Sequence, residues 1–176
     1  MQLKKTIQDK VISVLKSTLT RLGFADTTVF FEYQNSPEPV KTYVAMHVLD
    51  TQELGGSSKS IFLEDVQGDN TVGTNYSQQH YKATIQLSFV GVAAGDMAYS
   101  LRQALKNSIL TQEDFMRANL GFVSATRVRS NPQLQETRWV ESFNFDIEIN
   151  YSIQYTEEVN WVEFITINGT QIPSSS

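Results

Sequence analysis

The stretch FNFDIEINYSIQY, residues 143–155, alternates strictly between two kinds of side chain. Its odd positions are apolar or aromatic and its even positions are polar, which is the pattern of a β-strand with one buried and one exposed face. At about 3.3 Å per residue this stretch spans roughly 43 Å, whereas an ordinary strand has about 5 to 6 residues. Such a strand is longer than a small hydrophobic core, so it is either twisted around a curved sheet or covered by another chain. The second option favours an assembly protein over a free monomer.

The composition fits one soluble domain with a substantial core. The chain has 176 residues, of which 40% are hydrophobic and 11% aromatic. It has no cysteine, which excludes disulfides, thiolate metal sites and a cysteine nucleophile. No segment has the continuous apolar run of a signal peptide or a membrane span, so we expect a protein made and used in a cytoplasm, without a membrane partner.

The acidic residues are concentrated at the C-terminal end. Residues 1–130 hold 13 Lys and Arg against 12 Asp and Glu, whereas residues 131–176 hold only Arg138 against seven Asp and Glu. A general nucleic-acid-binding protein carries a basic patch or stripe, and the chain as a whole lacks that composition. Tight nonspecific DNA binding is therefore disfavoured.

The first half of the chain predicts a helix followed by strands. Apolar residues recur at helical spacing over residues 2–22, and Gly23 follows where a helix is capped. Residues 29–34 and 43–49 are rich in aromatic and β-branched side chains, which predicts two strands joined by a Pro-rich turn.

A polar segment follows over residues 51–77, with Ile61, Phe62 and Leu63 as its apolar island. A structureless connection of more than about 15 residues is uncommon inside a compact domain and is usually a binding loop. We therefore expect an extended arm in which Ile61, Phe62 and Leu63 dock on a partner.

The second half predicts a second helix and more strands. Apolar residues at helical spacing cover residues 97–109, with Gly95-Asp96 as a plausible cap. Strand patterns cover the following segments: 81–89, 121–129, 138–155 and 159–167.

These elements together predict an α+β fold, in which a curved antiparallel sheet is covered by two amphipathic helices. We expect one domain over residues 1–170, including the arm, and a flexible C-terminal tail over residues 171–176.

Few residues suggest chemistry. His47 and His80 lie within strand patterns, and neither has a second histidine at metal-ligand spacing, so no metal or cofactor is expected. Asp146 and Glu148 lie two residues apart on one face of the long strand, where they would be either a solvated surface or, less favourably, a glycosidase-like acid pair.

Taken in order, these elements resemble the neck or tail terminator family of tailed bacteriophages, especially of the contractile-tailed type. The resemblance spans nearly the whole chain. It rests mainly on two patterns: the Gln34-x-x-Pro37-x-Pro39 turn and the Arg138-x-x-Glu141-x-Phe143-x-Phe145 strand.

The resemblance implies a structural virion protein at the neck, assembled in the host bacterial cytoplasm. Its subunits would form a ring, usually a hexamer, that ends the tail tube and joins the tail to the head connector. The partners implied are further copies of the chain, the tail tube protein, the sheath and the connector, and DNA would pass through without being gripped. Asp146 and Glu148 are candidates for the channel surface, because like charge discourages phosphate adsorption. The arm with Ile61, Phe62 and Leu63 is then a candidate for contact with a neighbouring subunit or the tail tube.

Three alternatives remain open from the sequence. The first is another tail component, such as a tail-completion or tube-like subunit, which would share the two-faced strands. The second is a small hydrolase that uses Asp146 and Glu148. The third is a nucleic-acid-binding module, which would show steeply salt-dependent DNA binding.

Overall fold

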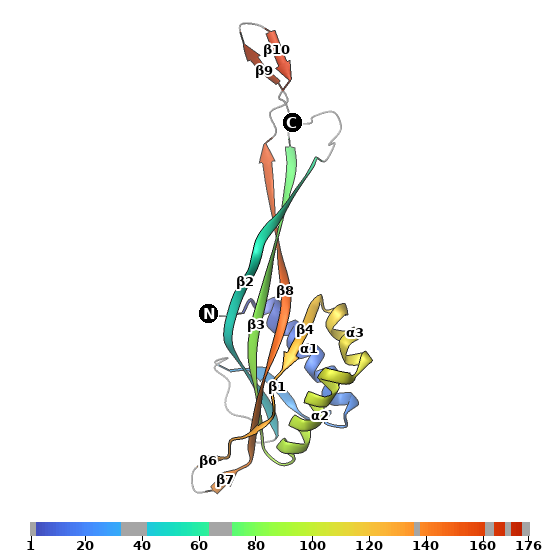
Figure 1. Ribbon diagram of the computed structural model, residues 1–176, viewed down its shortest axis with the longest axis vertical. Helices are drawn as coiled ribbons and strands as arrows, with labels where there is room; N and C mark the ends of the chain where they lie inside the picture. The colour runs from blue at the N-terminus through green and yellow to red at the C-terminus, as the bar shows by residue number, and fades with distance from the viewer. Residues whose placement is uncertain are drawn as a thin grey trace. The chain divides into compact units, whose positions relative to one another are not determined.

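A computed structural model describes residues 3–32, 42–63, 72–135, 138–160, 164–167 and 170–173 (Figure 1). The chain divides into two compact units. Unit 1 consists of residues 1–53 and 81–151, and unit 2 of residues 54–80 and 152–176. Three long strands contribute to both units: β2 (Tyr43–Leu63), β3 (Val72–Val90) and β8 (Ser142–Asn160).

The main sheet has six strands in the order β1-β2-β3-β8-β4, with β5 also paired to β8. The short strands are β1 (Thr28–Phe31), β4 (Leu120–Ala125) and β5 (Arg129–Ser130). Both β4 and β5 are antiparallel to β8. The expected α+β class is confirmed, whereas the sheet is mixed rather than purely antiparallel.

The mixed character comes from β1, which runs parallel to β2 with Val29 opposite Val44 and Phe31 opposite Met46. The prediction of two strands joined by a simple turn is therefore incomplete, because a parallel pair needs a connection longer than a tight turn. The parallel register buries all four of these side chains. Burial on one face thus fixes the register.

Contacts between β3 and β8 follow the order of an antiparallel pair. Tyr81 stacks on Tyr151 with ring centroids 5.4 Å apart, and Phe89 stacks on Phe145 at the same separation. A later residue of β3 thus lies beside an earlier residue of β8, which means that the two strands run in opposite directions. These aromatic pairs join the two central strands of unit 1.

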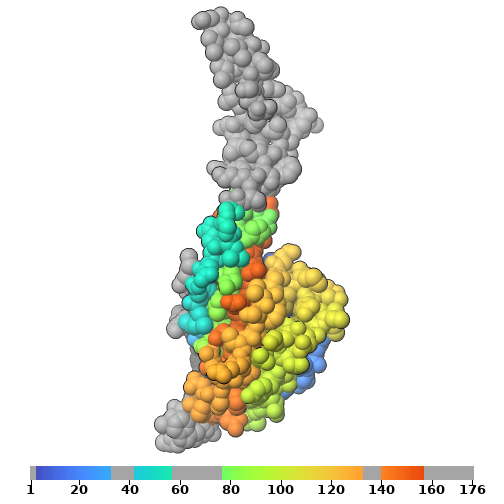
Figure 2. Space-filling view, in the orientation of Figure 1, coloured from blue at the N-terminus to red at the C-terminus, as the bar shows by residue number. Residues whose placement is uncertain are grey.

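Three helices, not two, lie together on one side of the sheet (Figure 1). They are α1 (Lys5–Arg21), α2 (Ala94–Asn107) and α3 (Ile109–Arg117). The expected second helix is interrupted at Ser108, whose backbone is extended with φ −85° and ψ 119° and whose hydroxyl accepts a hydrogen bond from the Thr111 amide at 3.4 Å. Ser108 is therefore the N-cap of a third helix that packs beside β4 (Figure 2).

The core lies between these helices and the odd-numbered face of β3 and β8. Its central residues are fully buried aromatic and aliphatic side chains. They include Val11, Leu15, Ile85, Leu87, Phe89, Met97, Leu101, Phe115, Phe145 and Ile147. The prediction of a two-faced strand is confirmed: one face of β8 is covered by the helices and the other is polar.

The start of α2 depends on close packing against β8. Ala93, with φ 62°, precedes the helix, so the expected Gly95-Asp96 cap lies within its first turn. A Cβ at Gly95 would lie 3.1 Å from the Phe143 ring. Glycine therefore allows the first turn of α2 to approach the strand.

The expected loop over residues 51–77 is wrong for most of its length. β2 continues to Leu63 and β3 begins at Val72, while residues 64–71 lie outside the described residues. Side chains at positions 52–56 are exposed, so no apolar alternation marks the strand. Pairing of its backbone with neighbouring strands forms it instead.

Two small hairpins complete the structure. In unit 1, β6 (Gln133–Gln135) is antiparallel to β7 (Arg138–Val140), and Glu141 separates β7 from β8, so the single strand expected over 138–155 is two strands. In unit 2, β9 (Phe164–Ile167) is antiparallel to β10 (Thr170–Pro173). Residues 174–176 of the expected tail lie outside the described residues.

Candidate functional site

The sheet face of unit 1 opposite the helices is polar along β3 and β8. Even-numbered residues of both strands lie on it, because successive side chains of a strand point to opposite faces. The two sequence candidates, Asp146 and Glu148, are on this face, and both are only partly exposed. The structure therefore gives them a common surface and also gives each of them specific partners.

Glu148 lies between β3 and β4. Its Oε1 accepts a hydrogen bond from Lys82 Nζ at 3.0 Å, and its Oε2 accepts one from Ser124 Oγ at 3.0 Å. The hydrogen bond from Lys82, followed by that from Ser124, holds the pKa of the Glu148 carboxyl below its usual value. Glu148 is therefore ionised at neutral pH and forms an ion pair with Lys82.

Asp146 is held by a second set of groups. Its Oδ2 accepts a hydrogen bond from Arg129 Nη2 at 2.8 Å, and its Oδ1 accepts a longer one from Gln86 Nε2 at 3.4 Å. Its backbone amide donates to the Thr126 hydroxyl at 2.8 Å. Asp146 is thus fixed by β3, by β5 and by the connection that follows β4.

The two carboxylates and the two cations balance one another on this face. Sequence reasoning identified the acids but missed Lys82 and Arg129 as their partners. The signal was present, because Lys82 and Gln86 are even-numbered residues of an alternating strand, as are Asp146 and Glu148 on theirs. Only the pairing of β3 with β8 could show that these sets face each other.

The apolar island of the expected arm is the end of a strand. Ile61, Phe62 and Leu63 are the last residues of β2, in unit 2, and their side chains lie outside the described part of the chain. Their proposed contact with a neighbouring subunit or a tube stays a prediction.

The structure gives no support to a metal or acid–base site. His47 Nδ1 lies 3.4 Å from a Glu32 carboxylate oxygen, across the edge of the sheet. In the described ranges, no three His, Asp or Glu side chains are grouped so that they could hold a metal ion. Asp146 and Glu148 are each paired with a cation, an arrangement that suits cohesion of the sheet better than proton transfer.

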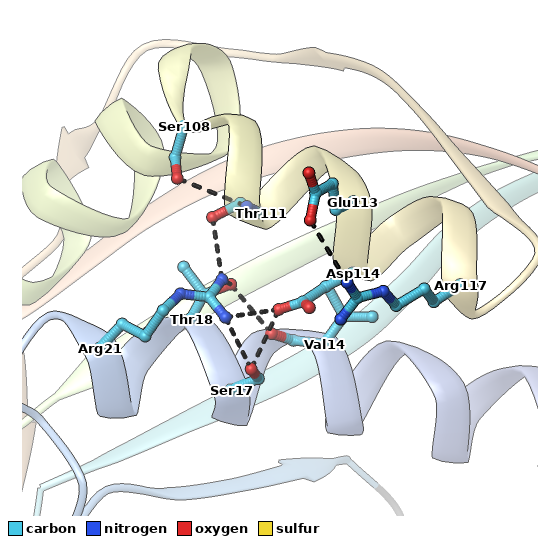
Figure 3. A network of polar contacts seen from close by, with 9 residues as sticks. All are labelled: Val14, Ser17, Thr18, Arg21, Ser108, Thr111, Glu113, Asp114 and Arg117. Carbon is cyan, nitrogen blue, oxygen red and sulfur yellow. Dashed lines mark hydrogen bonds and ion pairs between the residues drawn. The ribbon is translucent and has the colours of Figure 1, made fainter.

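A second polar network joins α1 to α3 (Figure 3). Arg21 Nη1 donates to Asp114 Oδ2 at 2.6 Å, and Ser17 Oγ donates to the same oxygen at 3.0 Å. Arg21 Nη2 also donates to the hydroxyls of Thr18 and Thr111 at 3.3 Å. The network holds the two helices together beside the core, which is a structural role.

The net charge of the protein belongs to unit 2. Unit 1 contains 13 Lys and Arg and 13 Asp and Glu, so its formal charge is zero. Unit 2 contains one Lys against six Asp and Glu, which gives the whole net charge of −5. Of the seven acids that residues 131–176 hold, Glu157, Glu158 and Glu163 belong to unit 2, together with three acids from residues 64–69. The other four belong to unit 1, where the cations balance them.

The sequence model of one protein family, described as phage neck terminator protein, matches residues 1–174. The chain belongs to the phage neck terminator family. The family name places its members at the neck of a phage particle, as the resemblance implied. No curated protein sequence matches the chain.

For a neck terminator protein, the polar sheet face and the acidic unit 2 are the surfaces of interest. The described residues include no helix that is long and apolar enough to cross a membrane.

Proposed function

We propose that this chain is the subunit of a closed ring, most simply a hexamer, at the neck of a tailed phage. The ring ends the tail tube, joins the tail to the head connector and lets DNA pass. The family match over residues 1–174 carries this proposal. The role is structural, without a cofactor or a catalytic step.

The strand architecture supports a subunit that is completed by its neighbours. β2, β3 and β8 have 21, 19 and 19 residues, far beyond the about 5 to 6 of an ordinary strand. Polar strand segments such as residues 52–56 are exposed and bury little of their own surface. Strands of this kind suit contacts with other copies, the tail tube, the sheath or the connector.

For the passage of DNA, we propose that the polar face with Asp146 and Glu148 borders the channel. Pairing with Arg129 and Lys82 makes this face polar but locally balanced, so it offers little attraction to phosphates. The negative charge that repels DNA then comes from unit 2. A smooth, weakly binding channel is what a conduit for DNA requires.

Electron microscopy of the purified protein, alone and mixed with tail tubes, tests the proposal. The expected result is a finite ring that also sits on one end of each tube and stops its growth. Open stacking into tubes would instead identify a tube-like subunit. A protein that stays monomeric and ignores tubes would overturn the proposed function, and a ring map with Asp146 and Glu148 away from the lumen would overturn the channel assignment.

A further inference from the structure

The sheet of unit 1 has two different outer edges. At one edge, β4 has a strand neighbour, β8, on one side only. At the other edge, β1 covers β2 only over Tyr43–Met46. Among the described residues, no strand pairs with positions 47–53 of β2 on the β1 side. Each edge therefore presents backbone groups that another strand can pair with.

The first edge, which we call the β4 edge, is apolar and basic. Its register against β8 shifts between Phe122 and Ser124, and Val123 at that shift is 46% exposed. The adjacent α3 exposes Ile109 by 72% and Met116 by 65%. Isolated exposed apolar residues are common, but these lie on two elements in contact.

The charge of the β4 edge comes from arginines. Residues 117–130 contain three Arg and no Asp or Glu. Arg117 pairs with Glu113, and Arg129 pairs with Asp146. Arg127 is exposed, and no ion pair involves it within the described ranges. Arg127 can therefore form an ion pair with an acidic residue of another molecule.

The second edge, which we call the β2 edge, has the opposite charge. Residues 43–53 contain Asp50 and Glu53 and no Lys or Arg. Asp50 accepts hydrogen bonds from the Thr51 amide and from Gln52, at 2.8 and 2.9 Å, but the described residues offer it no cation. Leu49 beside it is 49% exposed.

We propose that the β4 edge of one copy binds the β2 edge of the next copy, head to tail. This inference rests on the proposed ring and names the surfaces that close it. The two edges are complementary in charge and each exposes apolar side chains, whereas a two-fold contact of β4 edge with β4 edge would join two basic surfaces. Contacts between two different surfaces generate rings when the rotation closes, as a ring subunit requires.

Cysteine cross-linking tests which edges meet. The chain has no cysteine, so each introduced thiol is unique. The double variant Val123→Cys with Leu49→Cys, treated with a short bis-maleimide, should give a ladder of covalent oligomers up to the full ring. Each single variant should stay uncross-linked, and a mixture of the two single variants should give dimers only.

Charge reversal tests whether complementarity drives the contact. Arg127→Glu and Asp50→Lys should each abolish assembly in light scattering, because each places like charges across the interface. Mixing the two variants should restore assembly, since every contact then joins opposite charges again. Lys16→Glu and Asp9→Lys, at exposed positions of α1, are matched controls and should leave assembly unchanged.

The outcomes separate this inference from the proposed function. Cross-linked dimers from Val123→Cys alone would show a two-fold contact and overturn the head-to-tail interface. The head-to-tail interface would also be wrong if the wild type forms rings but the double cysteine variant gives no ladder of cross-linked oligomers. The same holds if the β4 edge cross-links only to the tail tube protein, and in both cases the proposed ring function would stand. A wild-type chain that stays monomeric yet still caps tubes would overturn the ring and its interface but not the role in ending the tube. A wild-type chain that neither assembles nor caps tubes would overturn the whole proposed function.

Discussion

At the scale of single residues, one glycine, Gly91, fixes where the chain turns after β3. Gly91 ends β3 with φ +110°, a conformation that side chains other than glycine rarely adopt. A Cβ at this position would also lie 2.9 Å from Thr42 Oγ1 and 3.0 Å from Thr42 Cα. Any side chain at position 91 would therefore both strain the backbone and collide with Thr42.

We expect Gly91→Ala to lower the free energy of unfolding by about 2 kcal/mol or more, the sum of backbone strain and displacement of Thr42. Urea denaturation measures the loss. Gly23→Ala is the control, because Gly23 also has positive φ, at +88°, but has open space around the Cβ position. Equal losses in the two variants would show that the contact with Thr42 adds nothing.

The Arg21–Asp114 pair makes a prediction about pH. The hydrogen bond from Arg21 holds the pKa of the Asp114 carboxyl below its ordinary value of 3.8. A carboxyl with a lowered pKa in the folded state stabilises the protein above the unfolded pKa, and this contribution is lost as the pH falls through the folded pKa. The stabilisation is therefore complete at neutral pH.

Asp114→Asn should cost about 1 kcal/mol at pH 7, because the pair is partly exposed and screened by solvent. The difference from the wild type should shrink as the pH falls from about 4 through the lowered pKa of the folded Asp114 carboxyl, because the unfolded chain binds the proton first. Thermal denaturation of both proteins across this pH range checks the prediction. A loss that is independent of pH would point to packing rather than charge.

At the scale of elements, a single serine explains why two helices stand where the sequence pattern predicts one. The apolar spacing runs through residues 97–109 without interruption, but the helix ends at Asn107 and restarts at Ile109. Apolar periodicity reports burial and does not detect a cap. Ser108 supplies the local hydrogen bond that favours the break.

Ser108→Ala should destabilise the protein by about 0.5–1 kcal/mol, because the Thr111 amide loses its acceptor. Chemical denaturation checks this value. Ser100→Ala, within α2, is the matched control and should be neutral or slightly stabilising, since alanine is the better helix former there. The cap assignment fails if the two substitutions have the same effect.

Among the strands, those with one buried face were predictable from the sequence, and those formed only by pairing with other strands were not. The buried parts of β3 and β8 were predictable, since alternation marks any strand with one covered face. The distal part of β2 was not, because its residues 52–56 are exposed on both faces and carry no alternation. The parallel pairing of β1 with β2 likewise depends on partners that are remote from any local signal.

At the scale of the whole molecule, charge separates the two units. Unit 1 is formally neutral and unit 2 carries −5. The protein as a whole should therefore not hold DNA, although unit 1 contains 13 cations. A conduit needs this weak interaction, because each phosphate contact would slow the passage of DNA.

The triple variant Glu157→Lys, Glu158→Lys and Glu163→Lys tests this distribution by changing the charge of unit 2 by +6, from −5 to +1. We expect it to retain duplex DNA at low salt, with affinity that falls steeply as salt rises. The wild type should show no retention under the same conditions. The matching Gln variants, which leave unit 2 at −2, should also show none, and steeply salt-dependent binding by the wild type would contradict the conduit.

The sequence alone determined which faces are buried, because burial imposes a period on side chains wherever an element has one covered face. It thereby gave the α+β class, the opening helix, the two-faced strand at Phe143–Tyr155 and the acidic C-terminal region. It also named Asp146 and Glu148, though as free acids. Only the tertiary structure paired them with Arg129 and Lys82, and only it placed β4 and the part of β2 that β1 leaves uncovered at opposite edges of one sheet. The reason is physical: strand pairing joins residues far apart in the chain through backbone hydrogen bonds, which are nearly the same for every sequence.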